Sequence, residues 1–429
     1  MHNVFNRYDI RGNYPNEIDN SFAFKLGKAS ATFCRQNFKN KNIVVGFDTR
    51  KSSPQIKTNL INGIISSGVN IIDIGISTTD KVALAGNYYN ASFSIMITAS
   101  HNSFDHNGFK FIYKQENGFS NQDLAKIKNI FCQNNFSKDV DKGILIKKTN
   151  DFNKIYEEKV YSSLQKYTNI NNFNDLKIVV DCCNSCASLH LINLLKKLKC
   201  NIVKINCNLE AQENIEPEPT KENRQYVSDL IKKTKADIGI GVDPDADRVF
   251  AFDKNSKYVN GNEIFCLLAE LLDAKKIIAS IDTSSMLQDY MGNKNRKIIY
   301  SRIGDIFVSQ KAIKLNADFL GEPNGHYAFP EFCWYNSGIF ACLLLCSIAS
   351  QIPEKINNLP KYRVETKILK YPNNEEKQKA INKIKIRIKK NFEVINDLCG
   401  IKFRFNKSVC LIRASGTEAL IRIIVEKKI

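Results

Sequence analysis

The chain has 429 residues, of which 43% are hydrophobic and 25% are charged. This balance is ordinary for a globular protein and excludes collagen-like, coiled-coil and wholly disordered chains. A chain of this length is expected to form about two to four domains, each with its own core. The 62 Lys and Arg residues outnumber the 44 Asp and Glu residues, which gives a net charge of +18.

This positive charge has two interpretations. It would suit a polyanionic partner, either nucleic acid or phosphorylated small molecules. It would also arise if lysine were simply abundant throughout the chain. The lysines are spread along the sequence rather than gathered into one stripe with interleaved aromatic residues, so we favour the second interpretation and expect no nucleic-acid partner.

The 13 cysteines show no regular spacing. Cys183 and Cys186 form one C-x-x-C, but no second pair lies at the distance of a zinc site, and we interpret both, with Cys182, as small buried residues. So many free thiols indicate a reducing compartment. The N-terminal residues lack the apolar core of a signal peptide, and the longest apolar run, 338–349, is too short to span a bilayer. We therefore expect a cytoplasmic protein without a membrane partner.

Apolar segments rich in β-branched residues alternate with amphipathic stretches along most of the chain. The predicted strands lie in residues 42–50, 70–77, 92–100, 176–184, 200–206, 236–243, 275–283, 297–304 and 317–325. The predicted helices lie at 53–67, 188–198, 227–234, 264–272 and 305–314. Strand–helix–strand order with short connections predicts parallel α/β layers, repeated in three units of about 110 residues.

The end of the chain differs. It contains a strand-like segment at 364–371, a charged helix at 374–390 and two closing strands, KFRF and SVCLIR…ALIRIIVE. This pattern predicts a small α+β domain. We place four domains at 1–150, 151–253, 254–361 and 362–429.

The segment ITASHNSFDHNGFK is the first candidate for chemistry. An apolar strand delivers Ser100 into a polar turn, with His101 beside it and Lys110 ten residues further on. A serine with an imidazole and an ammonium group nearby suits a nucleophile or a phosphate carrier. The same composition is also typical of a plain turn.

The second candidate is IGIGVDPDADRVF, in which Asp243, Asp245 and Asp247 alternate at the end of a strand. In an extended segment all three carboxylates face one way. Because such carboxylates raise one another's pKa unless a cation neutralises them, a hard divalent ion, most simply Mg²⁺, is the interpretation we prefer over solvated loop acids.

Two further loops carry polar groups. GEPNGHYAF places Glu322 and His326 on a loop that suits hydroxyl recognition or is a surface turn. LIRASGTEALIRI offers a guanidinium group, hydroxyls and a flexible backbone between two apolar strands, which suits phosphate binding but also a hairpin turn.

Taken together and in this order, the four segments resemble the α-D-phosphohexomutase superfamily. They are most similar to its bacterial phosphomannomutase/phosphoglucomutase branch, because the opening Tyr8-Asp9-Ile10-Arg11-Gly12 resembles that branch rather than the G-T-D-G-I-R-G of phosphoglucosamine mutases. The resemblance covers essentially the whole chain. It implies three related α/β domains with mixed sheets sandwiched by helices, a smaller C-terminal α+β domain, and a central active-site cleft.

The resemblance also implies a role for each matching residue. Ser100 is similar to the serine that carries the catalytic phosphoryl group, and together with Asp243, Asp245 and Asp247 it would bind Mg²⁺. Lys110 matches a general acid/base candidate. Three further residues, Arg11, His101 and Arg248, match the lining of the phosphoserine site. The substrate-binding residues implied in this way are Tyr8, Glu322, Asn324, His326, Arg413, Ser415, Gly416 and Thr417.

The implied activity is an intramolecular phosphotransferase that interconverts hexose 1-phosphate and hexose 6-phosphate, with mannose or glucose as the hexose. It would use an active-site phosphoserine and a hexose 1,6-bisphosphate intermediate, with glucose 1,6-bisphosphate as activator. The implied partners are phosphorylated hexoses, and the implied assembly is a monomer or weak homodimer.

Several residues depart from the family pattern, among them Ser185 and Cys186, which replace a usual Gly-rich turn away from the chemistry. Ser103 replaces a usual proline, Asp305 replaces a common histidine, and Asn324 gives an E-x-N-G-H motif that resembles N-acetylglucosamine-phosphate mutases. The alternative substrate is therefore glucosamine phosphate or N-acetylglucosamine phosphate. The remote alternatives are an aspartyl phosphotransferase or phosphatase that uses Asp243 as nucleophile, which would leave the other three loops unexplained, and a non-catalytic binding protein.

Overall fold

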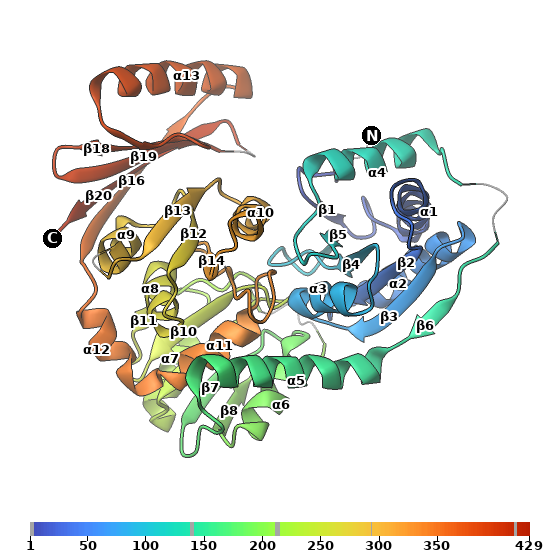
Figure 1. Cartoon of the computed structure of the whole chain (residues 1–429), viewed down its shortest axis with the longest axis horizontal. Coiled ribbons are helices and arrows are strands. Elements are labelled where there is room, and N and C mark those ends of the chain that lie inside the picture. The colour runs from blue at the N-terminus through green and yellow to red at the C-terminus, as the bar shows by residue number, and fades with distance from the viewer. Residues whose placement is uncertain (1–3, 138–140, 211–214, 293, 416–417) are drawn as a thin grey trace. The chain divides into compact units, whose positions relative to one another are not determined.

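The computed structural model describes residues 4–137, 141–210, 215–292, 294–415 and 418–429. The chain divides into two compact units. The first comprises Met1–Val259 and Gly325–Pro353, and the second comprises Asn260–Asn324 and Glu354–Ile429. The first unit contains two mixed sheets, which carry most of the candidate catalytic residues (Figure 1).

The first sheet has the strand order β1-β5-β4-β2-β3-β6. Strands β4, β2, β3 and β6 run parallel, whereas β5 is antiparallel to β4 and β1 is antiparallel to β5. The bounds are β1 (Ile10–Asn13), β2 (Asn42–Phe47), β3 (Asn70–Ile76), β4 (Phe93–Ile97), β5 (His106–Tyr113) and β6 (Leu145–Lys147).

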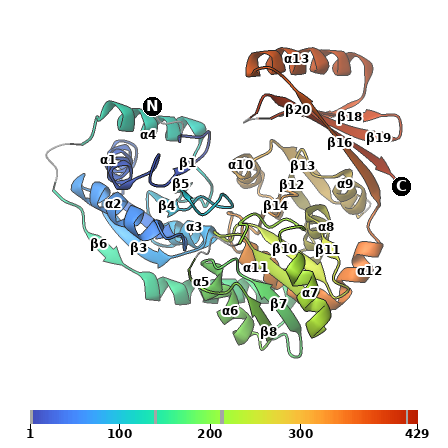
Figure 2. The same cartoon turned by 180° about the vertical axis from the view of Figure 1, so that it is seen from behind.

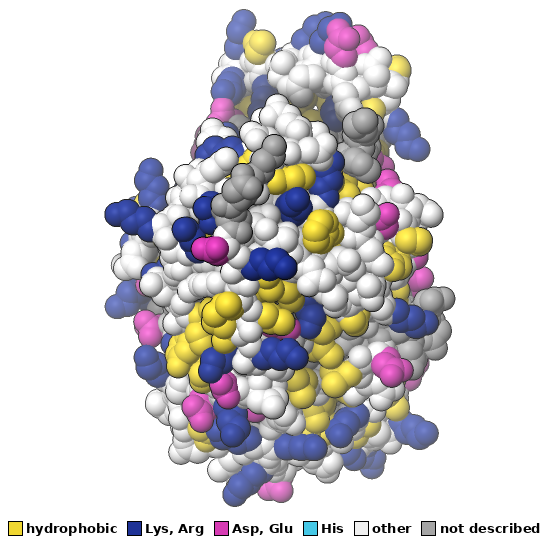
Figure 3. Space-filling model, turned by 90° about the vertical axis from the view of Figure 1, so that its right-hand side faces the viewer, with side chains coloured by type: hydrophobic (Ala, Val, Ile, Leu, Met, Phe, Trp, Pro, Cys, Tyr) yellow, Lys and Arg dark blue, Asp and Glu magenta, His cyan; other side chains and the backbone are white. Residues whose placement is uncertain are grey.

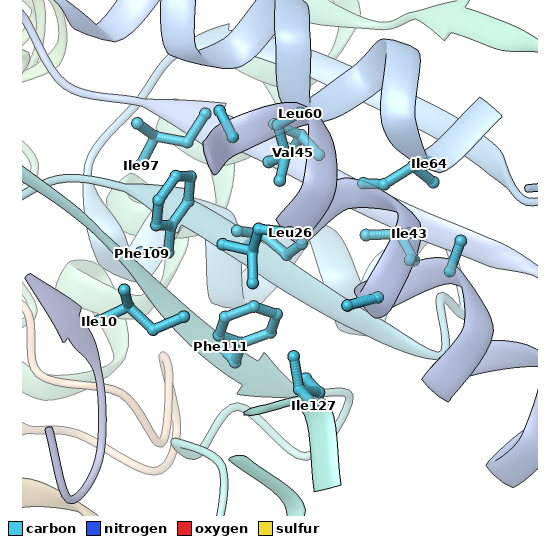
Figure 4. Packing of buried hydrophobic residues seen from close by; sticks show 14 of the residues in the cluster. Ile10, Leu26, Ile43, Val45, Leu60, Ile64, Ile97, Phe109, Phe111 and Ile127 are labelled. Carbon is cyan, nitrogen blue, oxygen red and sulfur yellow. The ribbon is translucent and has the colours of Figure 1, made fainter. Parts of the chain in front are cut away.

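Helices α1 (Asn20–Asn37), α2 (Ser53–Ser66) and α4 (Asn121–Gln133) share one core with this sheet. Leu26, Leu60 and Ile127 of these helices meet Val45 and Phe111 of the strands there (Figure 4). The first two helices pack so closely that there is no room for a side chain at Gly27. A Cβ atom there would lie only 2.2 Å from the carbonyl oxygen of Leu60. The remaining helices of this region are α3 (Thr79–Tyr88), which contacts β2 and β4, and α5 (Thr149–Thr168), which contacts β3.

The second sheet has the order β11-β10-β9-β7-β8. Strands β8, β7 and β9 are parallel, and β10 and β11 are antiparallel additions. The bounds are β7 (Lys177–Asp181), β8 (Asn201–Ile205), β9 (Ile238–Val242), β10 (Val249–Asp253) and β11 (Tyr258–Val259). Helix α6 (Ala187–Lys197) contacts β8, α7 (Gln225–Thr234) contacts β7 and β9, and the apolar α11 (Gly338–Ser347) packs on β9 and β10 (Figure 2).

The second unit contains the parallel strands β13 (Lys297–Ser301), β12 (Lys276–Ser280) and β14 (Phe319–Gly321). Its helices are α8 (Gly261–Leu271), α9 (Ser285–Gly292), α10 (Asp305–Leu315) and, later in the chain, α12 (Ile352–Asn357). Short elements at the end of the first unit are β15 (Tyr327–Ala328) and the 3₁₀ turn η1 (Ala349–Gln351).

The last sheet is antiparallel, in the order β16-β20-β19-β18-β17, with α13 (Asn374–Asn391) against β19 and β20. Its strands are β16 (Tyr362–Lys370), β17 (Val394–Asn396), β18 (Ile401–Phe405), β19 (Ser408–Ala414) and β20 (Leu420–Lys428). Glu426 of β20 accepts hydrogen bonds from the backbone amide and the hydroxyl of Ser285, both 2.9 Å long, so this sheet is anchored to α9.

The predicted fold class is confirmed, and the predicted strands and helices occur in the predicted order. The chain also has helices that the prediction omitted, notably α1, α3, α4, α5, α9 and α11. The last predicted strand is in fact two strands, β19 and β20, because the chain reverses direction after Ala414. The boundaries placed between the four domains remain a prediction.

Among the described residues no single helix is long and apolar enough to cross a membrane. Helix α11 reaches that length and hydropathy only together with Ala349–Asn357, from which it is bent by 71°. On the face shown in Figure 3, Lys and Arg side chains are scattered among acidic and uncharged ones.

Candidate functional site

Two loops of the first unit bring the candidate residues together. The Ser100 loop (residues 98–105) connects β4 to β5, and the acidic loop (residues 243–248) connects β9 to β10. The Ser100 loop carries Ser100 and His101, and β5 adds Lys110. Arg11 comes from β1, which pairs with β5. The structure therefore brings these residues together within this unit, and their roles remain a prediction.

Ser100 lies at the centre of this site, and its side chain is buried, with 2% of the residue exposed. Its backbone has the left-handed φ of 53°, which is unfavourable for a residue with a Cβ atom. The hydroxyl oxygen lies 3.3 Å from Nδ1 of His101 and 3.5 Å from Oδ2 of Asp243. The hydroxyl therefore points at the acidic loop rather than into solvent.

The acidic loop gathers three buried carboxylates. One oxygen from each of Asp243, Asp245 and Asp247 lies within 4.8 Å of the others. Our expectation that an extended strand brings them to one side is wrong. The segment is a turn in which Ala246 has a φ of 58°, and this reversal is what makes the side chains converge.

The carboxylates differ in their electrostatic surroundings. Burial, together with the charges of Asp247 and Asp245, raises the pKa of Asp243 well above its usual range. Burial would also raise the pKa of Asp247, but the charges of Lys110 and His326 hold it well below the usual range. The group therefore combines one carboxyl that favours a proton with another that favours negative charge, and a divalent cation would replace the proton.

Basic groups surround the carboxylates. Nζ of Lys110 donates hydrogen bonds of 2.6 Å to both Asp245 and Asp247. Burial lowers the pKa of Lys110, but these two carboxylates raise it well above its usual range. The backbone amide of Arg248 donates to Asp243 at 3.1 Å, and its Nε lies 3.2 Å from Nε2 of His326.

Two further basic side chains, those of Arg11 and His101, lie next to Ser100. Arg11 donates to the carbonyl oxygen of Ala99 at 3.1 Å and to the side chain of Asn102 at 3.0 Å, so it holds the Ser100 loop on both sides of Ser100 along the chain. Burial and the charges of Arg248 and Arg11 lower the pKa of His101 to about 2. The imidazole of His101 is therefore neutral at physiological pH and can accept a hydrogen bond through its unprotonated ring nitrogen.

Two contacts of the site were not predicted from the sequence. Arg50, which comes after β2, donates hydrogen bonds to the backbone of the Ser100 loop, including one of 2.7 Å to the carbonyl oxygen of Ser100. Thr79, at the start of α3, donates from its hydroxyl to Oδ2 of Asp245 at 2.8 Å. Both lie beyond the carboxyl end of a parallel strand, and that position is the sequence signal that would have included them.

The other predicted residues belong to other segments or lie outside the described part of the chain. Tyr8 precedes β1. In the second unit, Glu322 and Asn324 come after β14, and the Glu322 carboxylate accepts a hydrogen bond of 2.8 Å from the amide of Gly304.

Arg413 lies on β19, and the carbonyl oxygen of Ser415 accepts a hydrogen bond of 2.7 Å from Nζ of Lys377. Gly416 and Thr417 lie outside the described residues. Lys377 thus shapes the start of this loop from α13, which the sequence analysis did not predict.

The arrangement has clear chemical capabilities. Three buried carboxylates are typical ligands of a hard divalent cation. The Ser100 hydroxyl faces these carboxylates. A lysine, two arginines and a neutral histidine surround the serine and the carboxylates. Basic groups around a serine beside a cation site are suited to holding and transferring a phosphoryl group, because that reaction depends on positioning and charge neutralisation.

Comparisons with known proteins agree on one family. Three models of the phosphoglucomutase/phosphomannomutase family match the chain: alpha/beta/alpha domain I at residues 2–138, domain II at 154–257 and domain III at 260–365. The Thermococcus kodakarensis phosphoglucomutase/phosphomannomutase is 30% identical, over 100% of this chain and 95% of that protein. A probable phosphoglucosamine mutase from Pyrococcus horikoshii is also 30% identical, over 99% of this chain and 94% of that protein.

Solved structures share the fold. A phosphoglucomutase/phosphomannomutase family protein from Burkholderia thailandensis has a TM-score of 0.89 at 23% identity and covers 100% of this chain and 94% of its own. Aspergillus fumigatus N-acetylphosphoglucosamine mutase in complex with GlcNAc-6P and magnesium has a TM-score of 0.59 at 14% identity, covering 100% and 92%. The same enzyme in complex with glucose 1,6-bisphosphate has a TM-score of 0.54 at 13% identity, covering 99% and 91%.

Proposed function

The chain belongs to the phosphoglucomutase/phosphomannomutase family, whose members are phosphotransferases of the mutase type, and we propose that it interconverts hexose 1-phosphate and hexose 6-phosphate through a phosphoserine at Ser100. The observation that carries this proposal is the position of Ser100. Its buried hydroxyl lies 3.5 Å from Asp243, which belongs to a group of three carboxylates, and basic side chains flank it.

The acidic loop fits a divalent cation. Its three carboxylates are fully buried, and Oδ1 of Asp245 is a buried oxygen with no hydrogen-bond partner. A buried unpaired carboxylate oxygen is costly unless a cation or a donor satisfies it. We propose Mg²⁺, held by Asp243, Asp245 and Asp247 with the phosphorylated Ser100. When bound, the ion supplies charge neutralisation for the phosphoryl group.

The proposed transfer of the phosphoryl group uses this chain's own residues. The free hydroxyl of the sugar attacks the phosphorus of phospho-Ser100, so that a sugar oxygen–phosphorus bond forms as the Ser100 Oγ–phosphorus bond breaks. As the Ser100 Oγ–phosphorus bond breaks, Oγ takes a proton from Lys110, and Lys110 takes the proton of the attacking sugar hydroxyl, so that Ser100 is left as a free hydroxyl. We assign Lys110 as the general acid/base candidate, and Arg11, His101 and Arg248 as the groups that hold the phosphoryl oxygens.

The product of the first transfer is a hexose 1,6-bisphosphate. This intermediate then reverses its orientation in the site. Its other phosphate is transferred to Ser100, which completes the isomerisation. Glucose 1,6-bisphosphate would prime the serine in the same way. The Aspergillus fumigatus relative crystallised with glucose 1,6-bisphosphate supports this choice of activator.

Substrate selection is assigned to the remaining loops. We propose that Arg413, Ser415, Gly416 and Thr417 hold the phosphate that does not react, and that Tyr8, Glu322, Asn324 and His326 contact the sugar. His326 has a second connection, since its Nε2 lies 3.1 Å from Oδ1 of Asp247. It is therefore placed to link sugar binding to the acidic loop.

An amino sugar is the second candidate substrate. Asn324 gives the E-x-N-G-H motif, and similar proteins from Pyrococcus horikoshii and Pyrococcus abyssi are named probable phosphoglucosamine mutases. The two assignments share the same phosphoryl chemistry and differ at the sugar. Mannose or glucose phosphate remains our first proposal because of the opening Tyr8-Asp9-Ile10-Arg11-Gly12.

A substrate panel tests both. The purified protein with Mg²⁺ and a trace of glucose 1,6-bisphosphate is given the 1-phosphates of mannose, glucose, glucosamine and N-acetylglucosamine, and formation of each 6-phosphate and of free phosphate is followed. Isomerisation of mannose and glucose phosphates supports the first proposal, and a preference for an amino sugar supports the second. If no sugar is isomerised, the proposal fails, and release of free phosphate would indicate a phosphatase.

A further inference from the structure

We propose that Arg50 is a positioning residue that fixes the backbone of the Ser100 loop, so that the serine hydroxyl faces the acidic loop. This inference deepens the proposed function. It rests on that function only where its test measures mutase activity. Arg50 itself is 1% exposed, and its guanidinium contacts the loop backbone, Asp48 and the Phe104 ring, so it acts through Ser100 rather than on substrate.

The guanidinium group of Arg50 lies inside the Ser100 loop. Nη2 donates to the carbonyl oxygens of Ser100 and Asn102, both at 2.7 Å. Nη1 donates to the carbonyl oxygens of Ser103 and His106, at 2.6 and 3.0 Å. The loop therefore wraps around one cation, with carbonyl groups from both of its ends directed inward.

The same guanidinium is fixed in orientation. Its Nε donates to Oδ2 of Asp48 at 3.1 Å, and the Phe104 ring lies 5.1 Å from its central carbon. Asp48 in turn accepts a hydrogen bond of 2.6 Å from the Ser53 hydroxyl. Every N–H of the guanidinium thus has an acceptor, and Asp48 holds the planar group in the orientation that reaches both ends of the loop.

Physical reasons make an arginine necessary here. Converging carbonyl oxygens repel one another, and Ser100 has an unfavourable left-handed backbone, so the loop needs a central donor to keep this shape. A lysine at the same place has three donors on one nitrogen and cannot span four carbonyls in a plane. The shape of the loop, and with it the direction of the Ser100 hydroxyl, therefore depends on the guanidinium.

The chain offers a matched control. Arg224 is also fully buried, lies 3.4 Å from Asp181 and donates to the carbonyl oxygens of Pro217 and Asn223, but it does not contact the Ser100 loop. Replacing either arginine by lysine removes a buried guanidinium and its carbonyl contacts. Only Arg50→Lys is expected to change the geometry at Ser100.

The experiment compares Arg50→Lys, Arg224→Lys and the unmodified protein, all as full chains. For Arg50→Lys we expect kcat to fall about 100-fold while KM stays within about threefold, because the misplaced group is the nucleophile. Phosphorylation of Ser100 by glucose 1,6-bisphosphate, followed by mass spectrometry, should slow in parallel. For Arg224→Lys we expect kcat within about threefold of the unmodified protein.

Hydrogen exchange separates this inference from the proposed function. In Arg50→Lys the amides of residues 98–107 should exchange at least about tenfold faster, with the rest of the chain unchanged and no such effect in Arg224→Lys. This measurement does not need activity, so it tests the loop even if no sugar is isomerised. Unchanged exchange in the loop, or an unchanged kcat in an active enzyme, would overturn the proposal.

A second variant covers the case in which Arg50→Lys does not fold. Asp48→Asn keeps the guanidinium but removes the carboxylate that orients it. We expect kcat to fall about tenfold with KM unchanged and exchange in residues 98–107 to rise. Wild-type values for both measurements in a folded Asp48→Asn protein would show that the loop does not depend on this pair.

Discussion

The two sheets of the first unit repeat one strand arrangement but carry different functional groups at the same loop. Without β6, the first sheet has the order β1-β5-β4-β2-β3, and the second has β11-β10-β9-β7-β8. In each, three parallel strands are followed by two antiparallel ones. The Ser100 loop and the acidic loop occupy the same place, between the third parallel strand and its antiparallel neighbour.

The correspondence extends to single residues. Phe47 pairs with Ile97 in the first sheet, and Asp181 pairs with Gly241 in the second. Asp48, one residue beyond Phe47, corresponds to Asp181, because each accepts a hydrogen bond from the amide two residues on, Arg50 at 3.1 Å and Cys183 at 2.9 Å. Thr98, one residue beyond Ile97, then corresponds to Gly241, and the next residue but one is Ser100 in the first sheet and Asp243 in the second.

The two sheets differ in the residue that donates this amide. The first sheet has Arg50 there, which turns the loop carbonyls inward and leaves the serine hydroxyl to face the acidic loop. The second sheet has Cys183, which is buried, and its loop is instead held by groups from elsewhere, namely Thr79 and Lys110. One backbone arrangement therefore carries the proposed phosphate carrier in one sheet and the proposed cation site in the other, and the two loops differ in a few side chains.

The largest expected effect comes from removing the serine of this pair. Ser100→Ala should lower mutase activity at least about 1,000-fold and abolish labelling of the protein by glucose 1,6-bisphosphate, since the phosphoryl group would have no oxygen to bind. Activity is followed by product formation and labelling by mass spectrometry. Ser66→Ala, at the end of α2, is the control and should keep full activity. Substantial mutase activity in Ser100→Ala would refute the phosphoserine scheme.

Its counterpart Asp243 gives the next prediction. Asp243→Asn removes one of three crowded carboxylates, so we expect divalent-ion binding by calorimetry to weaken strongly and activity to fall about 100-fold or more. Without metal the variant should be more stable than the unmodified protein by about 1 kcal/mol or more, because it avoids the cost of either charging or protonating Asp243, whose pKa is raised by burial and by its two acidic neighbours. A lower melting temperature in chelator, with Asp229→Asn as the exposed-site control, would show that the carboxylates do not repel one another.

Thr79 is the point at which the first sheet's helix α3 holds the second sheet's loop. Thr79→Val keeps the shape of the side chain but removes the hydroxyl that donates to Asp245. Because partners of metal ligands orient them, we expect Mg²⁺ affinity to fall about 10-fold. Titration with Mg²⁺ under mutase turnover measures this, and Thr58→Val on α2 is the control. Unchanged Mg²⁺ dependence would mean that the other contact of Thr79, a hydrogen bond of 3.0 Å from its backbone amide to the carbonyl oxygen of Asp245, is enough to hold the loop.

The sequence allowed the fold class and most of this site to be predicted for a physical reason. Strands show an apolar pattern that local residues determine, and Ser100, Asp243 and Lys110 lie in or beside polar segments next to such strands. The turn at Ala246 was not predicted, since a left-handed alanine has no signature in its own residue type.

Contacts between residues far apart along the chain could not be predicted from the sequence, for a different reason. Arg50 and Thr79 each act on a loop that is distant along the chain, and neither residue type is unusual in a turn. The apolar α11 packs on β9 and β10, and its Cys342 Sγ lies 3.7 Å from the carbonyl oxygen of Gly241, although about 100 residues separate them in sequence. Only the folded chain shows such pairings.

The smallest predicted effect concerns a buried cation that, unlike Arg50, lacks a full set of partners. Lys81 of α3 is completely buried, and its Nζ donates to the carbonyl oxygen of Ile76 at 3.3 Å and to the side chain of Asn153. Burial lowers its pKa to about 8, although the nearby groups Cys186, Asp80 and Glu157 act in the opposite direction. The folded protein therefore gives up this proton at a lower pH than the unfolded chain, whose lysine has a pKa near 10.5.

The sign of the pH effect comes from this difference. Below about pH 8 both states hold the proton, and the folded state bears the full cost of burying the charge. Between about pH 8 and 10.5 only the unfolded chain keeps the proton, so the stability of the unmodified protein should rise by up to about 1.4 kcal/mol per pH unit from this group. Lys81→Met lacks the group and should lack that rise.

Urea denaturation of both proteins between pH 7 and 10 measures the difference. We expect Lys81→Met to be more stable by about 1–3 kcal/mol at pH 7, with the gain reduced by the lost contacts, and the advantage to shrink above pH 8. Lys126→Met, at an exposed position of α4, is the control and should show no such pH dependence. If the advantage of Lys81→Met stayed constant or grew with pH, the buried ammonium would be better satisfied than its two contacts indicate, and the contrast with Arg50 would be lost.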